Sequence, residues 1–247
     1  MAKDDKISPS QKQAQDITGK TQVSSTSEID AFLQQVKTLA PQQNAQQRGR
    51  LIFAMDATMS RRPTWDMALS LQAQMFHEVA AIGGLDVQLV YFRGFSECQA
   101  SKWVSDAKAL ANLMAKVECI GGQTQIGRVL THARYETDKK KVNALVYVGD
   151  CMEEKIDDLA AHAGELGLLG VPLFVFQEGN DKTAEVAFRE ISRLSGGAFF
   201  RFDAGAAHQL RELLSAVAVY AAGGQKALID HSKRHGGQAK YLLEQLT

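Results

Sequence analysis

The stretch Leu51-Ile52-Phe53-Ala54-Met55, followed by Asp56-Ala57-Thr58-Met59-Ser60, decides the fold of this chain. A short apolar run bounded by turn-forming residues predicts a buried strand. One carboxylate and two hydroxyls, those of Asp56, Thr58 and Ser60, follow where that strand ends. In open α/β sheets, ligands bind at the carboxyl ends of the strands, so a functional site is expected at this position.

Two later segments bring similar groups to the same edge of the predicted sheet. Gly121-Gly122-Gln123-Thr124 is a glycine-bearing loop that opens an apolar-periodic helix. A second apolar strand, residues 142–148, is followed by Gly149 and Asp150. Oxygen ligands without histidine or cysteine suit Mg²⁺ or Mn²⁺ far better than zinc. The predicted metal ligands are therefore Asp56, Thr58, Ser60, Thr124 and Asp150.

This set of motifs resembles the metal-ion-dependent adhesion site (MIDAS) of von Willebrand factor type A domains, in their bacterial cytoplasmic form. The pattern is Asp-x-Thr-x-Ser, then Gly-Gly-x-Thr, then a strand that ends in Asp, and the resemblance spans roughly residues 48 to 222. Thr58 stands where the family more often has Ser, which keeps the hydroxyl. Cys151 stands where the family often has Gly.

The resemblance and the ligand chemistry lead to the same expected site. The hydroxyls of Thr58, Ser60 and Thr124 would coordinate Mg²⁺ directly, with Mn²⁺ or Ca²⁺ as other candidate ions. Asp56 and Asp150 would neutralise charge and orient bound waters. An Asp or Glu carboxylate of a protein partner would complete the octahedral shell, so the expected function is that of a metal-dependent protein-binding module and not of an enzyme.

The order of the remaining elements predicts a doubly wound α/β domain, with a mostly parallel sheet covered on both faces and one antiparallel edge strand. Further strands are expected at residues 86–92, 98–104, 171–176 and 198–202. Helices are expected after Pro63 and at 105–117, 153–169, 182–194 and 210–220.

Four regions follow from this pattern. Residues 1–26 are polar and are expected to be disordered. Residues 27–49 are expected to form an amphipathic helix and a Gln-rich linker. The von Willebrand factor type A-like domain should span 50–222, and 223–247 should form a C-terminal helical extension.

Composition limits the classes of partner. The 247 residues carry 28 basic and 28 acidic side chains, so the formal net charge is zero and gives no general attraction to nucleic acid or an anionic membrane. No apolar run approaches the roughly 20 residues that span a bilayer. No signal peptide and no disulfide framework are evident, and the expected compartment is the cytoplasm. Arg61 and Arg62 are expected to rim the site and attract an acidic partner.

Two other functions compete with the binding module. A phosphohydrolase resembling haloacid dehalogenases would use Asp56 as its nucleophile and Asp150 as a Mg²⁺ ligand. This chain lacks the lysine that would neutralise the phosphate in such an enzyme. Its run Lys139, Lys140 and Lys141 precedes the second apolar strand and so lies at the opposite edge of the sheet from Asp56. The other alternative is a metal-free scaffolding domain. No His–Cys relay is identifiable for Cys151, so a catalytic thiol is not predicted.

Overall fold

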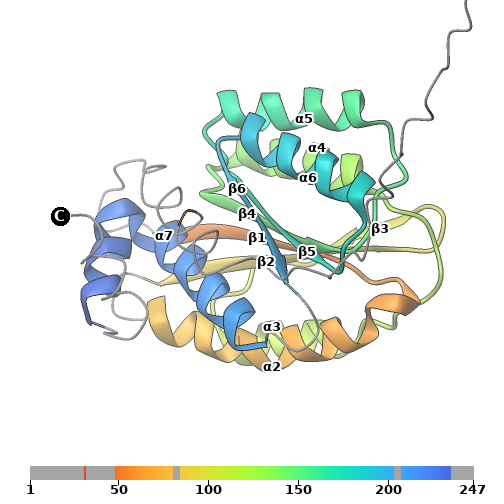
Figure 1. Ribbon diagram of the computed structural model, residues 1–247. Helices are drawn as coiled ribbons and strands as arrows, with labels where there is room; N and C mark the ends of the chain where they lie inside the picture. Colours follow the sequence, from red (N-terminus) through yellow and green to blue (C-terminus); the bar gives the residue numbers. More distant parts are fainter. Residues whose placement is uncertain (1–30, 32–47, 80–83, 203–206, 235–247) are drawn as a thin grey trace, which may run out of the picture.

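Six strands form one sheet in the order β3-β2-β1-β4-β5-β6 (Figure 1). The computed structural model describes residues 31, 48–79, 84–202 and 207–234, with only the backbone at 60, 70–76, 78, 79, 207–210, 225 and 228. Of the described strands, β3 alone pairs antiparallel, with β2, and the other pairings are parallel. The strands are β1 (Gly49–Asp56), β2 (Leu85–Arg93), β3 (Glu97–Ala100), β4 (Ala144–Gly149), β5 (Leu173–Glu178) and β6 (Ala198–Phe202).

Helices cover both faces of this sheet (Figure 1). One layer contains α2 (Arg62–Val79), α3 (Ala107–Met114) and α7 (Ala207–Arg234), and the other contains α4 (Ile126–Lys139), α5 (Ile156–Leu168) and α6 (Lys182–Leu194). A short 3₁₀ helix, η1 (Met59–Arg61), joins β1 to α2. The architecture confirms the predicted doubly wound α/β fold with one antiparallel edge strand.

The central strand β1 is buried on both faces, and its side chains alternate between two cores. Leu51 and Phe53 belong to the core under α2, α3 and α7. Ile52 and Ala54 belong to the core under α4, α5 and α6. This explains why the strand is apolar at every position from 51 to 55, as expected for a parallel strand covered on both sides.

A buried polar network fixes the start of β1. The backbone N–H of Arg50 donates to the side-chain oxygen of Asn143, just before β4, at 2.8 Å. The guanidinium of Arg50 pairs with Glu136 of α4 at 3.1 Å and lies 3.8 Å from the ring centroid of Trp103.

Because the β1–β4 pairing aligns Met55 with Val148, the two strands end at the same level.

Most predicted elements appear where the periodicity placed them, and α6 and β6 have the expected bounds. Two local expectations were wrong. Helix α5 begins at Ile156 and not at residue 153. The edge strand ends at Ala100, and Val104 makes only an isolated bridge.

The predictions for the two ends of the chain fall largely on residues that the structure does not describe. The expected disorder of 1–26 and, apart from residue 31, the expected helix and linker up to residue 47 lie outside the described residues. At the other end, α7 is interrupted at Gly224, whose φ of 67° is left-handed, one residue after the predicted start of the extension. Among the described residues, no helix has the length and apolar content that crossing a bilayer requires.

Candidate metal centre

The side chain of Asp56, at the end of β1, is fully buried. Its Oδ1 accepts the backbone N–H of Thr58 at 2.7 Å, whereas Oδ2 has no hydrogen-bond donor among the described residues. Burial raises the pKa of Asp56 to about 6, and the negative charge of Asp150 adds to this effect, while hydrogen bonds from Thr58 and the charge of Arg61 oppose it. A buried carboxylate with an unsatisfied oxygen is costly unless a cation joins it.

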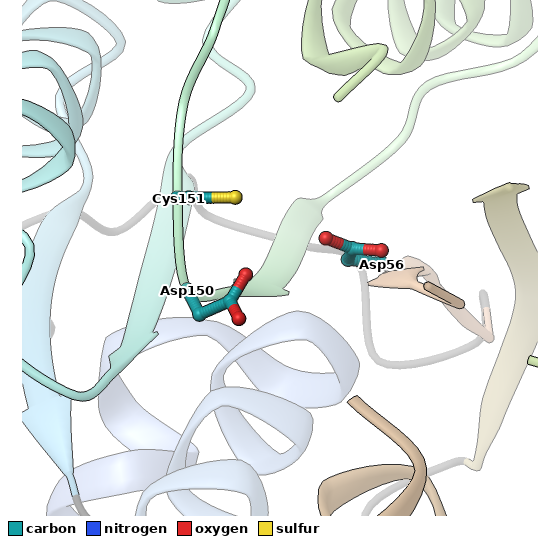
Figure 2. Close-up of side chains that lie close together, drawn as sticks. All are labelled: Asp56, Asp150 and Cys151. Carbon is teal, nitrogen blue, oxygen red and sulfur yellow. The ribbon is translucent and has the colours of Figure 1, made fainter. Parts of the chain in front are cut away.

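Asp150 follows β4 and faces Asp56 across the ends of the two strands (Figure 2). One carboxylate oxygen from each residue and the Sγ of Cys151 all lie within 4.8 Å of one another. Figure 2 shows the three side chains pointing into the same space. The topology brings them together because β1 and β4 are adjacent and parallel, so both strands end on one edge.

Thr124 is tied to the loop that carries Asp150. Its backbone N–H donates to the carboxylate of Glu153 at 3.0 Å, and its hydroxyl accepts the backbone N–H of Glu153 at 3.0 Å. The hydroxyl keeps a second lone pair, so this bond does not prevent it from binding a cation. The structure therefore joins the second and third predicted loops through a reciprocal pair of hydrogen bonds.

The next residue, Glu154, caps the helix that the Gly-Gly loop opens. Its two carboxylate oxygens accept the backbone N–H groups of Ile126 at 2.6 Å and Gly127 at 2.9 Å, at the start of α4. A negative charge at a helix N-terminus satisfies groups that have no partner inside the helix. Sequence reasoning missed this role, since it placed Glu153 and Glu154 at the start of their own helix. No local pattern links residue 154 to residue 126.

The second glycine of the Gly-Gly pair is required for close packing. A Cβ on Gly122 would lie 2.1 Å from the backbone oxygen of Gly94 in the turn after β2, whereas a Cβ on Gly121 would meet nothing within 4 Å. The backbone N–H of Gln123 donates to that same oxygen at 3.0 Å. The β2–β3 turn therefore supports the loop that positions Thr124.

The structure places the five predicted ligands to different extents. Asp56 and Asp150 lie together, Thr58 lies beside Asp56, and Thr124 is bonded to the Asp150 loop. The backbone of Ser60 is in η1, but its side chain lies outside the described part. The ligand set as a whole remains a prediction.

Arg61 is a feature of the site that the sequence did not reveal. We expected Arg61 and Arg62 to rim the site, but Arg61 is only 2% exposed and its Nη1 donates to Glu178 at the end of β5, while Arg62 is exposed. The same Nη1 lies 4.0 Å from Oδ2 of Asp150. The guanidinium lies beside Asp150 and Glu178, and its charge also acts on Asp56, so this cluster of three carboxylates and one guanidinium has a formal charge of minus two when all are ionised. One divalent cation would neutralise this cluster.

The same geometry argues against covalent catalysis. Burial, followed by the charge of Asp150, raises the pKa of Cys151 to about 12, so without a metal its thiol stays protonated near neutral pH. The lysines that a phosphohydrolase would need are remote. Lys139 ends α4, and the amine of Lys141 donates to the carbonyl of Gly170, before the start of β5.

Comparison with solved structures assigns the fold. The chain superposes on the von Willebrand factor type A protein from Catenulispora acidiphila with a TM-score of 0.55 and 16% identity, over 70% of this chain and 43% of that one. The SpRpn10 VWA domain matches with a TM-score of 0.53 and 12% identity, over 72% and 98%. This chain has the von Willebrand factor type A fold.

A third similar structure carries a metal. Proximal thread matrix protein 1 from the mussel byssus, described with a zinc-occupied MIDAS motif, matches with a TM-score of 0.54 and 16% identity over 71% of this chain and 47% of that one. This chain therefore spans less than half of the mussel and Catenulispora proteins. No protein-family model and no curated protein matches the sequence. At these identities the likeness concerns the fold.

The raised pKa of Asp56 gives a testable pH dependence. The metal-free folded state holds a proton on Asp56 up to about pH 6, whereas the ordinary value is 3.8. Between these values the folded state binds more protons, so stability falls as pH rises from about 4 to 6 and the penalty stays above pH 6. Asp56→Asn should therefore be more stable than the wild type in EDTA at pH 7, by up to about 3 kcal/mol.

Urea unfolding at pH 4 and pH 7 measures this effect, and the stability gain should disappear at the lower pH. Asp66→Asn, at an exposed position of α2, is the control and should be neutral. A destabilised Asp56→Asn at pH 7 without metal would contradict the account.

The two glycines of the Gly-Gly loop provide a matched pair. Gly122→Ala should weaken metal binding and lower the melting temperature, because its methyl group would displace the backbone of Gly94 or the loop itself. Gly121→Ala should change both only slightly. Thermal melting and Mg²⁺ titration of the two variants test this, and equal effects would show that the contact with Gly94 does not position the loop.

Proposed function

We propose that this protein binds one divalent cation at the ends of β1 and β4 and uses it to hold a carboxylate of a protein partner. Mg²⁺ is the proposed ion on the basis of the oxygen ligands, and Mn²⁺ and Ca²⁺ share the same ligand preference. The observation that carries the proposal is the pairing of the buried Asp56 with the half-buried Asp150, in which Oδ2 of Asp56 has no donor among the described residues. We place this function in the cytoplasm, as the sequence suggested.

Each group of the site has a role in this proposal. Thr58, Ser60 and Thr124 supply hydroxyl ligands, while Asp56 and Asp150 balance the charge and orient bound waters. A bound cation supplies an electrophilic centre that accepts one oxygen ligand from outside the protein. These residues therefore leave a position that an Asp or Glu side chain of the partner fills.

The surface around the site supports protein binding more than hydrolysis. Met59, Phe95 and Ile120 expose 60%, 80% and 40% of their areas. Met59 begins η1, and the other two lie on the connections after β2 and after α3. Two backbone hydrogen bonds connect these loops, Ile120 N–H to Ala57 at 3.1 Å and Gln123 N–H to Gly94 at 3.0 Å. Exposed apolar groups that adjoin a polar centre are typical of protein-interaction sites.

Metal and partner binding can be tested together. The immobilised 247-residue chain should retain partner proteins from a cell extract in Mg²⁺ and release them in EDTA, and calorimetry should show one Mg²⁺ per chain. Thr124→Ala should reduce both by about tenfold, because it removes a ligand hydroxyl. Thr131→Ala is the control, since the Thr131 hydroxyl donates within α4, to the carbonyl of Gly127. If partner binding is unchanged by EDTA and by Thr124→Ala, the metal-free scaffolding domain becomes the better explanation.

The hydrolase alternative predicts a different result. With Mg²⁺, the protein should show no turnover of generic phosphate esters and no stabilisation by beryllofluoride, because no lysine of the Lys139–Lys141 run lies near Asp56. Thermal melting with and without beryllofluoride, alongside a phosphatase assay, makes the measurement. Turnover that Asp56→Asn abolishes would establish Asp56 as a nucleophile and overturn the binding module.

A further inference from the structure

The residue after Asp150 places a thiol beside two carboxylates at this site. The Sγ of Cys151 lies within 4.8 Å of carboxylate oxygens of both Asp56 and Asp150. Its side chain is half-buried and points into the space that the two carboxylates face (Figure 2). The adjacent Oδ2 of Asp56 is fully buried and has no donor among the described residues, so a cation would satisfy it.

We propose that Cys151 is a direct metal ligand, and that its thiolate, together with Asp56 and Asp150, makes this a site that binds Zn²⁺ more tightly than Mg²⁺. This inference rests on the proposed function, since it concerns the same cation site: Mg²⁺ would take the hydroxyl ligands proposed above, whereas Zn²⁺ would take Cys151 and the two carboxylates directly. Zinc accepts thiolate sulfur and carboxylate oxygen in one tetrahedral shell, whereas Mg²⁺ takes oxygen in an octahedral one. Sulfur therefore adds affinity for zinc and none for magnesium.

The spacing of the three groups fits a single zinc ion. Bonds of about 2.3 Å to sulfur and 2.0–2.2 Å to oxygen place neighbouring ligand atoms roughly 3.3–3.6 Å apart in a tetrahedron. The three atoms, all within 4.8 Å of one another, need to close by about 1.5 Å at most. Rotation of exposed parts of Asp150 and Cys151 allows this, because both side chains are only partly buried. The fourth position stays open for the partner carboxylate.

Proton and charge balance are simple for this ligand set. As the zinc–sulfur bond forms, the thiol proton of Cys151 leaves to solvent, and the bound ion carries the positive charge that stabilises the thiolate. One zinc ion between the Sγ of Cys151 and the carboxylates of Asp56 and Asp150 would place a positive charge beside all three negative groups.

The test compares three metals on the 247-residue chain and its variants. Calorimetry should give a lower Kd for Zn²⁺ than for Mg²⁺ in the wild type. Cys151→Ser should weaken Zn²⁺ binding about tenfold or more and leave Mg²⁺ binding within about twofold. Co²⁺ as a probe should give a sulfur-to-cobalt charge-transfer band that Cys151→Ser abolishes. Cys98→Ser is the control, a half-buried cysteine of β3, and should retain the band.

Each outcome decides a different point. Zn²⁺ binding unchanged in Cys151→Ser, or a band lost in Cys98→Ser but kept in Cys151→Ser, would overturn the assignment of Cys151 while the Mg²⁺ site stood. The assignment of Cys151 would also be overturned if the wild type bound Mg²⁺ at least as tightly as Zn²⁺. If the single substitution Asp56→Asn abolishes binding of both Mg²⁺ and Zn²⁺, this result supports one site that both ions share. If the wild type binds neither ion, the proposed function and this inference both fail.

Discussion

A negative charge buried at the end of the central strand is the constraint on which the top of this domain depends. Asp56 is inaccessible to solvent, yet one of its oxygens accepts no hydrogen bond from a described residue. Desolvation of a carboxylate is expensive, and the nearby Asp150 increases the cost. Thr58 and Arg61 offset part of it, the first by hydrogen bonds and the second by its charge. The remaining imbalance has the size and sign that one divalent ion removes.

The loops around this charge are built as one unit. Glu153 and Glu154, after β4, hold Thr124 and the first turn of α4, while Gly94, after β2, holds the Gly-Gly loop from the other side. Apart from the bond between Gln123 and Gly94, each of these hydrogen bonds joins a backbone N–H to a side-chain oxygen, and together they constrain the position of each loop. Such a preorganised frame lets a site change its ion or its partner through a few exposed side chains.

Binding and catalysis place different demands on the same residues. A nucleophilic Asp56 would need a neighbouring cation free to neutralise phosphate, but Arg61 is buried and donates to Glu178. A nucleophilic Cys151 would need a lowered pKa, and its surroundings raise it. The exposed Met59, Phe95 and Ile120 provide apolar area where a partner surface can dock. The chemistry of the site therefore favours holding a ligand over transforming one.

Periodicity and motif spacing were enough to predict the doubly wound sheet, because a strand buried on both faces must be apolar throughout and a helix must repeat its apolar residues every three to four positions. They also placed Asp56 and Asp150 on one edge, since parallel strands end together. Tertiary structure alone decided the roles of Arg61, Glu154 and Gly122, which depend on contacts with residues 178, 126 and 94. The orientation of Cys151 toward both carboxylates was decided in the same way, because the direction of a loop side chain is set by packing between distant segments and leaves no periodic mark in the sequence.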